Sequence, residues 1–416
     1  MSDEHLARLQ VAARMAWLYA LPLIEIAATR ERSQAMGARM NAFAHMRRLA
    51  DHTSRVVTTP NNDTFYSTAQ VDLSHGPVTV TLPASGERYF SLALMDAYSN
   101  NFAVLGTRTT GGAGGVFTLI GPRDAAEGPN VVRAPTDHVW ALARTLVEGP
   151  HDVEAALAVQ QGLSMQGPAA AAPGPFAHRD AAWADYFASA ARLMALNSPP
   201  VTDRAVLDTI SPLGLAGFDP ARFSPEEAAA IEAGVAEARA GAGRAGQGGA
   251  AFIEGWGYPD WRLGDFGQAY GFRAAVALWG LAALPPVEAM YMRAGAPDGH
   301  ALFDGTRAWR LHFAPDRRVP VGAFWSLSLY EATRDGQFFF TDNPLGRYAI
   351  GDRTAGLAFG PDGGLDIWIG HESPGGERDS NWLPAPAGPF ALFMRAYLPK
   401  PELLEGRYRL PPVEPA

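Results

Sequence analysis

The sequence of 416 residues contains no cysteine. Disulfide bonds, thiolate metal sites, iron–sulfur clusters and cysteine nucleophiles are therefore excluded. Lysine is nearly missing too, since Lys400 is the single one and the other basic side chains are scattered arginines. Because the formal net charge is −9 and no basic run occurs, we expect no nucleic-acid partner.

Several catalytic signatures are also missing. The ten histidines form no H-x-H or H-x-x-x-H pair, so we expect no transition-metal site. Neither a G-x-S-x-G nucleophile turn nor a phosphate-binding G-x-x-x-x-G-K-[ST] loop occurs. We therefore predict no cofactor, with an oxygen-ligated Ca²⁺ or Mg²⁺ at Asn- and Asp-rich loops as the alternative.

The N-terminus lacks the features of a signal peptide, because Met1-Ser2-Asp3-Glu4 is acidic where such a segment is basic. The apolar stretch Val11–Ala28 is interrupted by Arg14, Pro22 and Glu25, which argues against a membrane span. Pro22 is expected to kink or end the first helix. We predict a cytoplasmic protein.

Apolar residues make up 47% of the chain, and 44 glycines and 33 prolines favour a turn-rich β architecture. Short β-like runs precede Pro150 and return near the C-terminus, with an Ala-rich helical stretch between them. The fold class predicted is α+β, mainly β, with two jelly-roll-like antiparallel β-sandwiches. The predicted parts are a helical segment (1–55), a first sandwich (56–150), a helical insert (151–290) and a second sandwich (291–416).

Within the insert, Ser224-Pro225-Glu226-Glu227 predicts a helix start, with Ser224 as N-cap and Glu227 completing a capping box. The segment Ala238–Ala250 is so rich in Gly and Ala that we expect a mobile loop there.

The two β blocks resemble each other. Tyr89–Ala97 aligns without gaps with Phe324–Ala332, which indicates an internal duplication. Each block has an acid at a strand end and an arginine inside its closing strand, namely Asp96 and Arg144 in the first, Glu331 and Arg395 in the second.

Thr58–Tyr66 is the most unusual segment, because amides, a carboxylate, hydroxyls and a phenol lie between apolar runs. Its candidate ligand-binding and catalytic residues are Asn61, Asn62, Asp63, Thr64 and Tyr66. The alternative is an Asx-type turn, in which Asn and Asp side chains cap their own backbone.

Asp96–Asn101 has the same ambiguity, with Tyr98, Asn100 and Asn101 as candidate ligand-binding residues. Asp63 and Asp96 would form an acid/base pair if the fold brings them together. Arg108 is predicted to pair with one of these acids or to stabilise negative charge.

Two further segments mix aromatic and polar residues. Trp256, Tyr270 and Arg273 would form either a wall of a ligand pocket or the packing between helix and sandwich. Asn381 and Trp382 would form either an aromatic lid or a structural corner.

Through Thr58–Tyr66, Asp96–Asn101 and Asn381–Pro386 the chain resembles a bacterial family of two tandem domains of unknown function, the 1254 type followed by the 1214 type. The resemblance covers nearly the whole chain and implies paired jelly-roll-like sandwiches with a helical part. It implies no agreed reaction and no catalytic residues. Many family members are exported, so the predicted cytoplasmic location departs from that pattern.

Three functional hypotheses follow. The first is a cofactor-independent hydrolase or lyase that acts on a small or amphipathic molecule between the sandwiches and helices. The second is a carbohydrate- or lipid-binding protein that uses Trp256, Trp261, Trp325 and Trp382. The third is a structural double jelly roll that assembles as a homo-oligomer.

Overall fold

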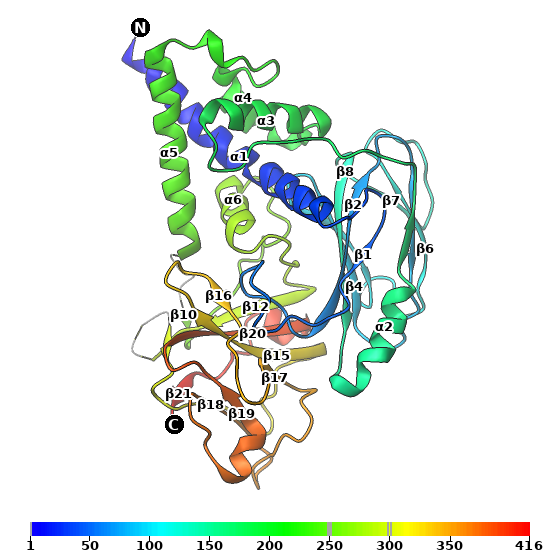
Figure 1. The fold of residues 1–416 in the computed structure, drawn as a ribbon, viewed down its shortest axis with the longest axis vertical. Helices are drawn as coiled ribbons and strands as arrows, with labels where there is room; N and C mark the ends of the chain where they lie inside the picture. Colours follow the sequence, from blue (N-terminus) through cyan, green and yellow to red (C-terminus); the bar gives the residue numbers. More distant parts are fainter. Residues whose placement is uncertain (1, 248–251, 298, 300–301) are drawn as a thin grey trace.

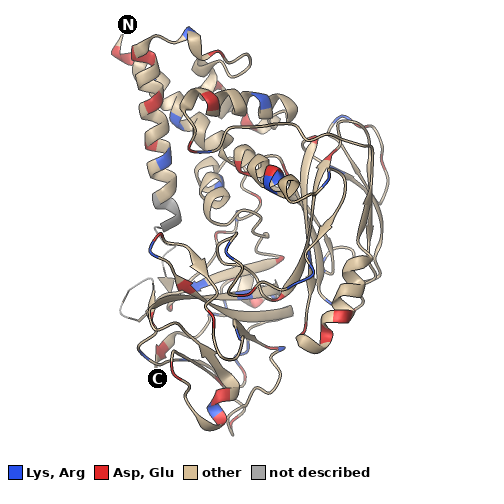
Figure 2. Ribbon diagram, viewed as in Figure 1, with Lys and Arg blue, Asp and Glu red and all other residues tan. Residues whose placement is uncertain are grey.

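The structure is a computed structural model that describes residues 2–247, 252–297, 299 and 302–416. It contains a β-rich region from the first half of the chain, a second one from the C-terminal part, and a group of helices that covers both (Figure 1). The mixed α+β class is confirmed. Charged residues of both signs are dispersed along the ribbon (Figure 2).

The first β-rich region consists of two sheets, with strand orders β1-β2-β8-β4-β5 and β7-β6-β3-β9. Alternate side chains such as Val80, Leu92 and Ala141 point between the sheets and form a shared apolar core. The strands are β1 Ala44–His45, β2 Thr64–Asp72, β3 Val78–Leu82, β4 Phe90–Asp96, β5 Asn101–Gly106, β6 Gly115–Ile120, β7 Val131–Arg133, β8 His138–Leu146 and β9 Ser164–Gln166.

The second β-rich region also has two sheets, one with the path β10-β11-β12-β20-β15-β16 and one with the order β19-β18-β14-β21. Leu311, Leu327 and Met394 belong to its core. The strands are β10 Phe252–Ile253, β11 Trp256–Gly257, β12 Ala289–Ala294, β13 Phe303–Asp304, β14 Trp309–Phe313, β15 Val321–Ala332, β16 Phe338–Phe339, β17 Ala349–Gly351, β18 Leu365–Gly370, β19 Trp382–Pro384, β20 Pro389–Pro399 and β21 Val413–Pro415.

The two regions share strand order and direction. The antiparallel set β2-β8-β4 corresponds to β12-β20-β15, and each region has one parallel pair, β6-β7 and β18-β19. Equivalent residues sit side by side: Tyr66, Arg144 and Ser91 in the first, Tyr291, Arg395 and Ser326 in the second. This register supports the internal duplication. The strand orders alone do not define a jelly roll, so that finer description stays a prediction.

Some strands lie outside the sequence limits expected for the sandwiches. β9 pairs with β3, so the first region includes residues beyond 150. β11 and β12 pair with each other and β12 with β20, so the second region begins before residue 291.

The helices pack mainly around α1, which is buried against α5, α6, α4 and α3. Its most apolar 18-residue window is long and apolar enough to cross a membrane, yet 78% of that window is buried inside the protein. The α-helices are α1 Asp3–Ala35, α2 Val153–Gln161, α3 Trp183–Leu196, α4 Arg204–Ile210, α5 Pro225–Gln247, α6 Tyr270–Trp279 and α7 Pro401–Leu404.

One local expectation is wrong, one is confirmed, and Pro22 does not end the first helix. α1 continues through Pro22, because tertiary burial of this helix outweighs the one backbone hydrogen bond that proline removes. The segment expected to be a mobile loop is helical up to Gln247, and residues 248–250 lie outside the described part of the chain. The capping box exists: the Ser224 amide donates to Glu227 and the Glu227 amide donates to Ser224.

One prediction concerns the hairpin of β4 and β5. Gly106 has φ +131°, and a Cβ there would lie 2.2 Å from the carbonyl oxygen of Phe90. We expect Gly106→Ala to lower the free energy of unfolding by at least about 2 kcal/mol, because backbone strain and steric overlap add. The matched control is Gly388→Ala, where a Cβ meets nothing within 4 Å. Denaturant unfolding measures both; equal stabilities would contradict the packing described for this hairpin.

Candidate functional site

The two β-rich regions are joined by reciprocal ion pairs between buried acids and arginines. Asp63, immediately before β2, accepts from Arg353 Nη2 at 2.9 Å and from the Ser326 hydroxyl at 2.6 Å, both in the second region. Glu288, immediately before β12, accepts from Arg108 Nε at 2.6 Å and from the Tyr89 hydroxyl at 2.9 Å, both in the first region. Each half thus supplies an acid to an arginine of the other half.

The arginines of the closing strands make a second reciprocal contact. Arg144 on β8 donates to the carbonyl of Ala282, in the segment that leads into the second region. Arg395 on β20 donates to the carbonyl of Thr59, in the segment that leads into the first. Both accepting residues have positive φ, 69° for Ala282 and 50° for Thr59. For residues other than glycine this conformation is strained, and such strain is concentrated at functional sites.

The two arginines differ in how well their guanidinium groups are satisfied. Arg395 also donates from Nη1 to the Ser328 hydroxyl at 2.7 Å. Arg144 is only 4% exposed, and its Nε and Nη1 have no hydrogen-bond partner among the described residues. Since an unpaired buried cation is costly, Arg144 is the group in this interface that most needs a ligand.

Tyrosine rings surround Arg144. Its guanidinium lies 5.4 Å from the centroid of the Tyr66 ring. Burial, together with the nearby Tyr291 and Tyr66, raises the pKa of the Tyr397 hydroxyl well above its usual value, although the charges of Arg144 and Arg395 lower it. Burial likewise raises the pKa of Tyr291. These phenols are protonated at neutral pH and can donate hydrogen bonds to an anion.

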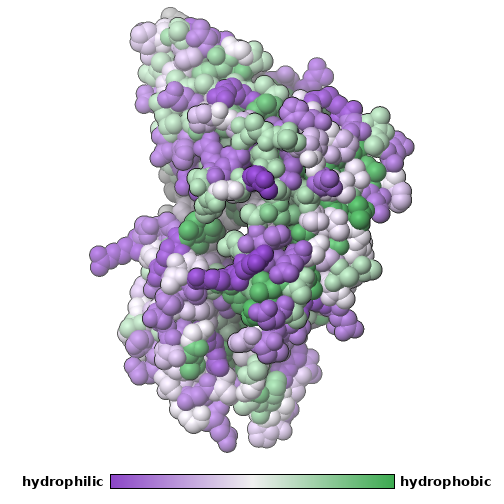
Figure 3. Space-filling view, turned by 45° about the vertical axis from the view of Figure 1, so that its right-hand side comes forward, coloured by the Kyte–Doolittle hydropathy of each residue, from purple (hydrophilic) through white to green (hydrophobic). Residues whose placement is uncertain are grey.

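Solvent reaches the edge of this cluster. Tyr66 and Tyr291 are partly exposed, whereas Arg144, Tyr89 and Tyr397 are buried. The surface carries apolar patches between polar side chains where the helical and β-rich parts meet (Figure 3). We define Arg144, Tyr66, Tyr291 and Tyr397 as the Arg144 site.

The segment Thr58–Tyr66 lies at this interface, as the sequence suggested. Most of its polar side chains form hydrogen bonds that stabilise the loop itself. The Asn61 amide nitrogen donates to the hydroxyls of Tyr397 and Thr64, and the Asn61 side-chain oxygen accepts from the Asp63 amide. Asn62 donates to the carbonyl of Ala50. Tyr66 alone lies beside Arg144.

The proposed acid/base pair of Asp63 and Asp96 is wrong. Asp63 lies next to Val147, beyond one end of β8, and Asp96 pairs with Val139 near the other end. At about 3.3 Å per residue the two positions are roughly 26 Å apart. Arg108 pairs with Glu288 and with neither of these acids.

Asp96 acts as a turn-forming residue. Its carboxylate accepts from the amides of Tyr98 and Asn100 and from the Asn100 side chain, which is an Asx-type arrangement. Burial raises the pKa of Asp96, and these hydrogen bonds lower it. Asn101 donates to the carbonyl of Ala283.

Three predicted residues, Tyr98, Tyr270 and Arg273, meet in a separate aromatic cluster. The Arg273 guanidinium lies 5.1 to 5.4 Å from the ring centroids of Tyr19, Tyr98 and Tyr270. The hydroxyls of Tyr19 and Tyr270 donate to the carboxylate of Asp203. This cluster joins α1 and α6 to the Asp96 turn.

The remaining predicted residues have structural contacts. The Trp256 ring nitrogen donates to the carbonyl of Pro411, and that of Trp382 donates to the carbonyl of Gly370. The Asn381 side chain donates to the carbonyls of Ala358 and Asp366. Among the described residues, no group of three or more His, Asp or Glu side chains is placed to hold a metal ion.

Sequence reasoning missed Arg353, Glu288, Tyr291 and Tyr397 as members of the interface. The available signal was the repeat: once Arg144 and Arg395 are aligned, their strand neighbours become candidates. The strand pairing was needed to identify those neighbours.

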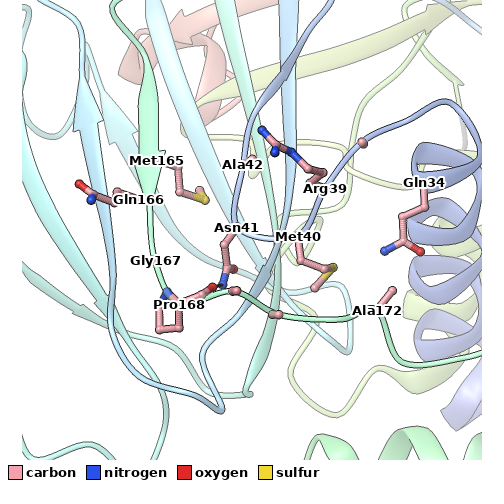
Figure 4. Close-up of a pocket in the computed structure, with 13 residues that line it drawn as sticks. Gln34, Arg39, Met40, Asn41, Ala42, Met165, Gln166, Gly167, Pro168 and Ala172 are labelled. Atoms are coloured by element: carbon pink, nitrogen blue, oxygen red, sulfur yellow. Dashed lines mark hydrogen bonds between the residues drawn. The ribbon is translucent and has the colours of Figure 1, made fainter.

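An open groove of about 590 Å³ lies elsewhere, between the end of α1, the start of the first region and the β9 strand (Figure 4). Gln34, Arg39 and Gln166 line it, with alanines and backbone. The Asn41 side chain in its wall donates hydrogen bonds to the carbonyls of Asp72 and Pro168 and accepts one from the Asp72 amide. None of the residues predicted from the sequence lines this groove.

The fold and interface define a class of protein with two duplicated β-rich regions joined by reciprocal buried ion pairs. The models of two families match: protein of unknown function DUF1254 at residues 40–167 and protein of unknown function DUF1214 at residues 288–401. The chain belongs to the proteins that carry these two domains in tandem, as the resemblance implied.

Among solved structures, the crystal structure of the VPA0106 protein from Vibrio parahaemolyticus is similar, with a TM-score of 0.75 and 23% identity over 98% of this chain and 100% of that one. An uncharacterized protein from Burkholderia cenocepacia gives a TM-score of 0.45 and 14% identity over 95% of this chain and 92% of that one. The first match supports the fold. The comparison with curated proteins gave no match.

Arg353 has a carboxylate partner and Arg144 has none, and this difference leads to a stability prediction. We expect Arg144→Met to leave the free energy of unfolding within about 1 kcal/mol or to raise it, because it removes a buried charge that lacks a partner. Arg353→Met should lower it by about 3 kcal/mol, since Asp63 then loses its arginine. Urea unfolding of the two variants tests this. A larger loss for Arg144→Met than for Arg353→Met would mean that Arg144 is structural.

A pH prediction concerns Asp352, beside Arg353. Burial raises its pKa to about 6, against the lowering effect of Arg353. A carboxyl group with a raised folded-state pKa stabilises the fold below its ordinary pKa, near 4, and that contribution is lost as the pH rises to 6. Asp352→Asn should therefore flatten the dependence of stability on pH between 4 and 6. Thermal unfolding at several pH values measures it, and an unchanged slope would contradict the prediction.

Proposed function

We propose that the protein binds a small molecule with an anionic group, between its two β-rich regions and its helices. The observation that carries this is the Arg144 guanidinium, buried with two nitrogens unpaired and ringed by protonated tyrosines. Native proteins satisfy such groups, and a ligand would do so here. Each pair of sheets is of the kind that jelly rolls use to enclose ligands, and we propose that finer description for both regions.

An enzymatic reaction at the same place is the second candidate. Tyr66 is partly exposed and stacks beside Arg144, so its hydroxyl can supply a proton while the guanidinium stabilises negative charge on the ligand. This would be the cofactor-independent hydrolase or lyase expected from the sequence. Asp63 fits a supporting role, because Arg353 and Ser326 already occupy its carboxylate.

The tryptophan-based alternative has weaker support. Trp256, Trp325 and Trp382 are buried, and of the four tryptophans considered only Trp261 is well exposed, at 81%. A carbohydrate platform needs several exposed aromatic faces.

Native mass spectrometry of the purified wild type and of Arg144→Gln tests the proposal. We expect a small molecule to remain with the wild type and to be lost from the variant, because the variant lacks the guanidinium that pairs with the anion. Arg310→Gln, at a partly exposed position on β14 away from the interface, serves as the control and should keep it. Equal retention by wild type and Arg144→Gln would exclude the Arg144 site.

If the molecule is a substrate, Tyr66→Phe should abolish its turnover while leaving its affinity within about tenfold. A loss of affinity with unchanged turnover at saturation would instead make Tyr66 a binding residue.

A further inference from the structure

We infer that the ligand of the Arg144 site is a monocarboxylate with an apolar body, such as a short aryl-alkyl or fatty acid. This inference rests on the proposed function and adds the chemical class of the ligand. Three observations carry it: the local balance of charge, the number of free donors and the apolar residues around Arg144.

Arg144 lacks an acid partner, unlike Arg353 and Arg108. Arg353 has Asp63 and Arg108 has Glu288 as carboxylate partners. Arg395 has no carboxylate partner either, but its guanidinium donates to both the Ser328 hydroxyl and the Thr59 carbonyl. Arg144 has one backbone carbonyl, and no carboxylate of the described residues forms an ion pair with it. One negative charge is what this site lacks.

A single charge selects a carboxylate over a phosphate. A phosphate dianion would bring two charges into a buried place that offers one uncompensated cation, so part of its charge would be buried unpaired. The other donors near Arg144 are neutral phenols, which suit the two oxygens of a carboxylate.

Apolar side chains also lie near Arg144, beyond the tyrosines. Leu142 lies two residues before it on β8, on the same face of the strand. Leu142 belongs to an apolar cluster that also receives Tyr66 and is made of residues from α1, β4, β8 and the segment before β12. Its members are Ile26, Met95, Trp140, Leu142 and Ala282, with Leu281 and Tyr66 packed against them.

This cluster borders the partly exposed edge of the site. Leu281 and Tyr66 are both partly exposed, so the apolar wall continues from the buried guanidinium towards solvent. An apolar group attached to a carboxylate would lie along that wall, and its burial would add to the binding energy.

Isothermal titration calorimetry with three probes tests the inference on the full chain at pH 7. The probes are 4-phenylbutanoate, its uncharged amide 4-phenylbutanamide, and phenyl phosphate. We expect saturable binding of the carboxylate, with the amide at least about tenfold weaker, because a hydrogen bond to a charged group is worth roughly that factor. Phenyl phosphate should bind more weakly than the carboxylate.

Variants separate the ligand class from the site. Arg144→Gln should weaken 4-phenylbutanoate at least about tenfold, and Arg144→Lys should recover part of the affinity because it keeps the charge. Arg310→Gln, on β14 away from the interface, should change the affinity by less than about threefold. Circular dichroism and thermal unfolding establish that each variant is folded before titration.

Several outcomes would overturn the inference. If the phosphate binds as tightly as the carboxylate and depends on Arg144, the ligand class is wrong while the proposed function stands. If the uncharged amide does so, the site needs no anionic group and the proposed function fails as well. If 4-phenylbutanoate binds equally to wild type and folded Arg144→Gln, the carboxylate does not bind at Arg144. If no probe binds folded wild type at millimolar concentration, the inference fails, and the mass spectrometry above decides the proposed function independently.

Discussion

The architecture depends on the exchange of buried charges between its two halves. Asp63 and Glu288 are almost fully buried, and each reaches an arginine of the opposite region. A buried acid deprived of its partner costs several kcal/mol, so neither region can keep its acid satisfied alone. The ion pairs therefore fix how the two regions face each other. That orientation places the inner strands β8 and β20, with Arg144 and Arg395, at a common interface.

Duplication explains why this interface contains two equivalent arginines, and divergence explains why they differ. Both arginines occupy the middle strand of a three-strand set, and both donate to a strained residue of the other half. In the second region a hydroxyl from Ser328 completes the set of acceptors. In the first region tyrosine rings lie beside the guanidinium of Arg144 instead of a hydroxyl acceptor, and its Nε and Nη1 have no hydrogen-bond partner among the described residues. A symmetric scaffold can thus hold one structural arginine and one that is available to a ligand.

Local sequence signals were reliable where short-range chemistry decides the structure. The Ser224 capping box and the Asx-type turn at Asp96 depend on residues a few positions apart, and both formed. Signals that depend on distant partners were less informative. Pro22 did not end α1, because burial against other helices outweighs a local defect. Arg108 is paired with Glu288, 180 positions away, which no local pattern indicates.

The sequence by itself determined the α+β class, the repeat and the family, because periodicity, turn residues and long motifs are properties of neighbouring positions. It also singled out Thr58–Tyr66 as a functional candidate. Only the tertiary structure decided that Asp63 and Asp96 lie at opposite ends of β8, and that Tyr66 joins Arg144. The physical reason is that burial and pairing depend on strand register and on contacts between the halves. The same residue type, arginine in a β-strand, is satisfied at 395 and unsatisfied at 144 for that reason alone.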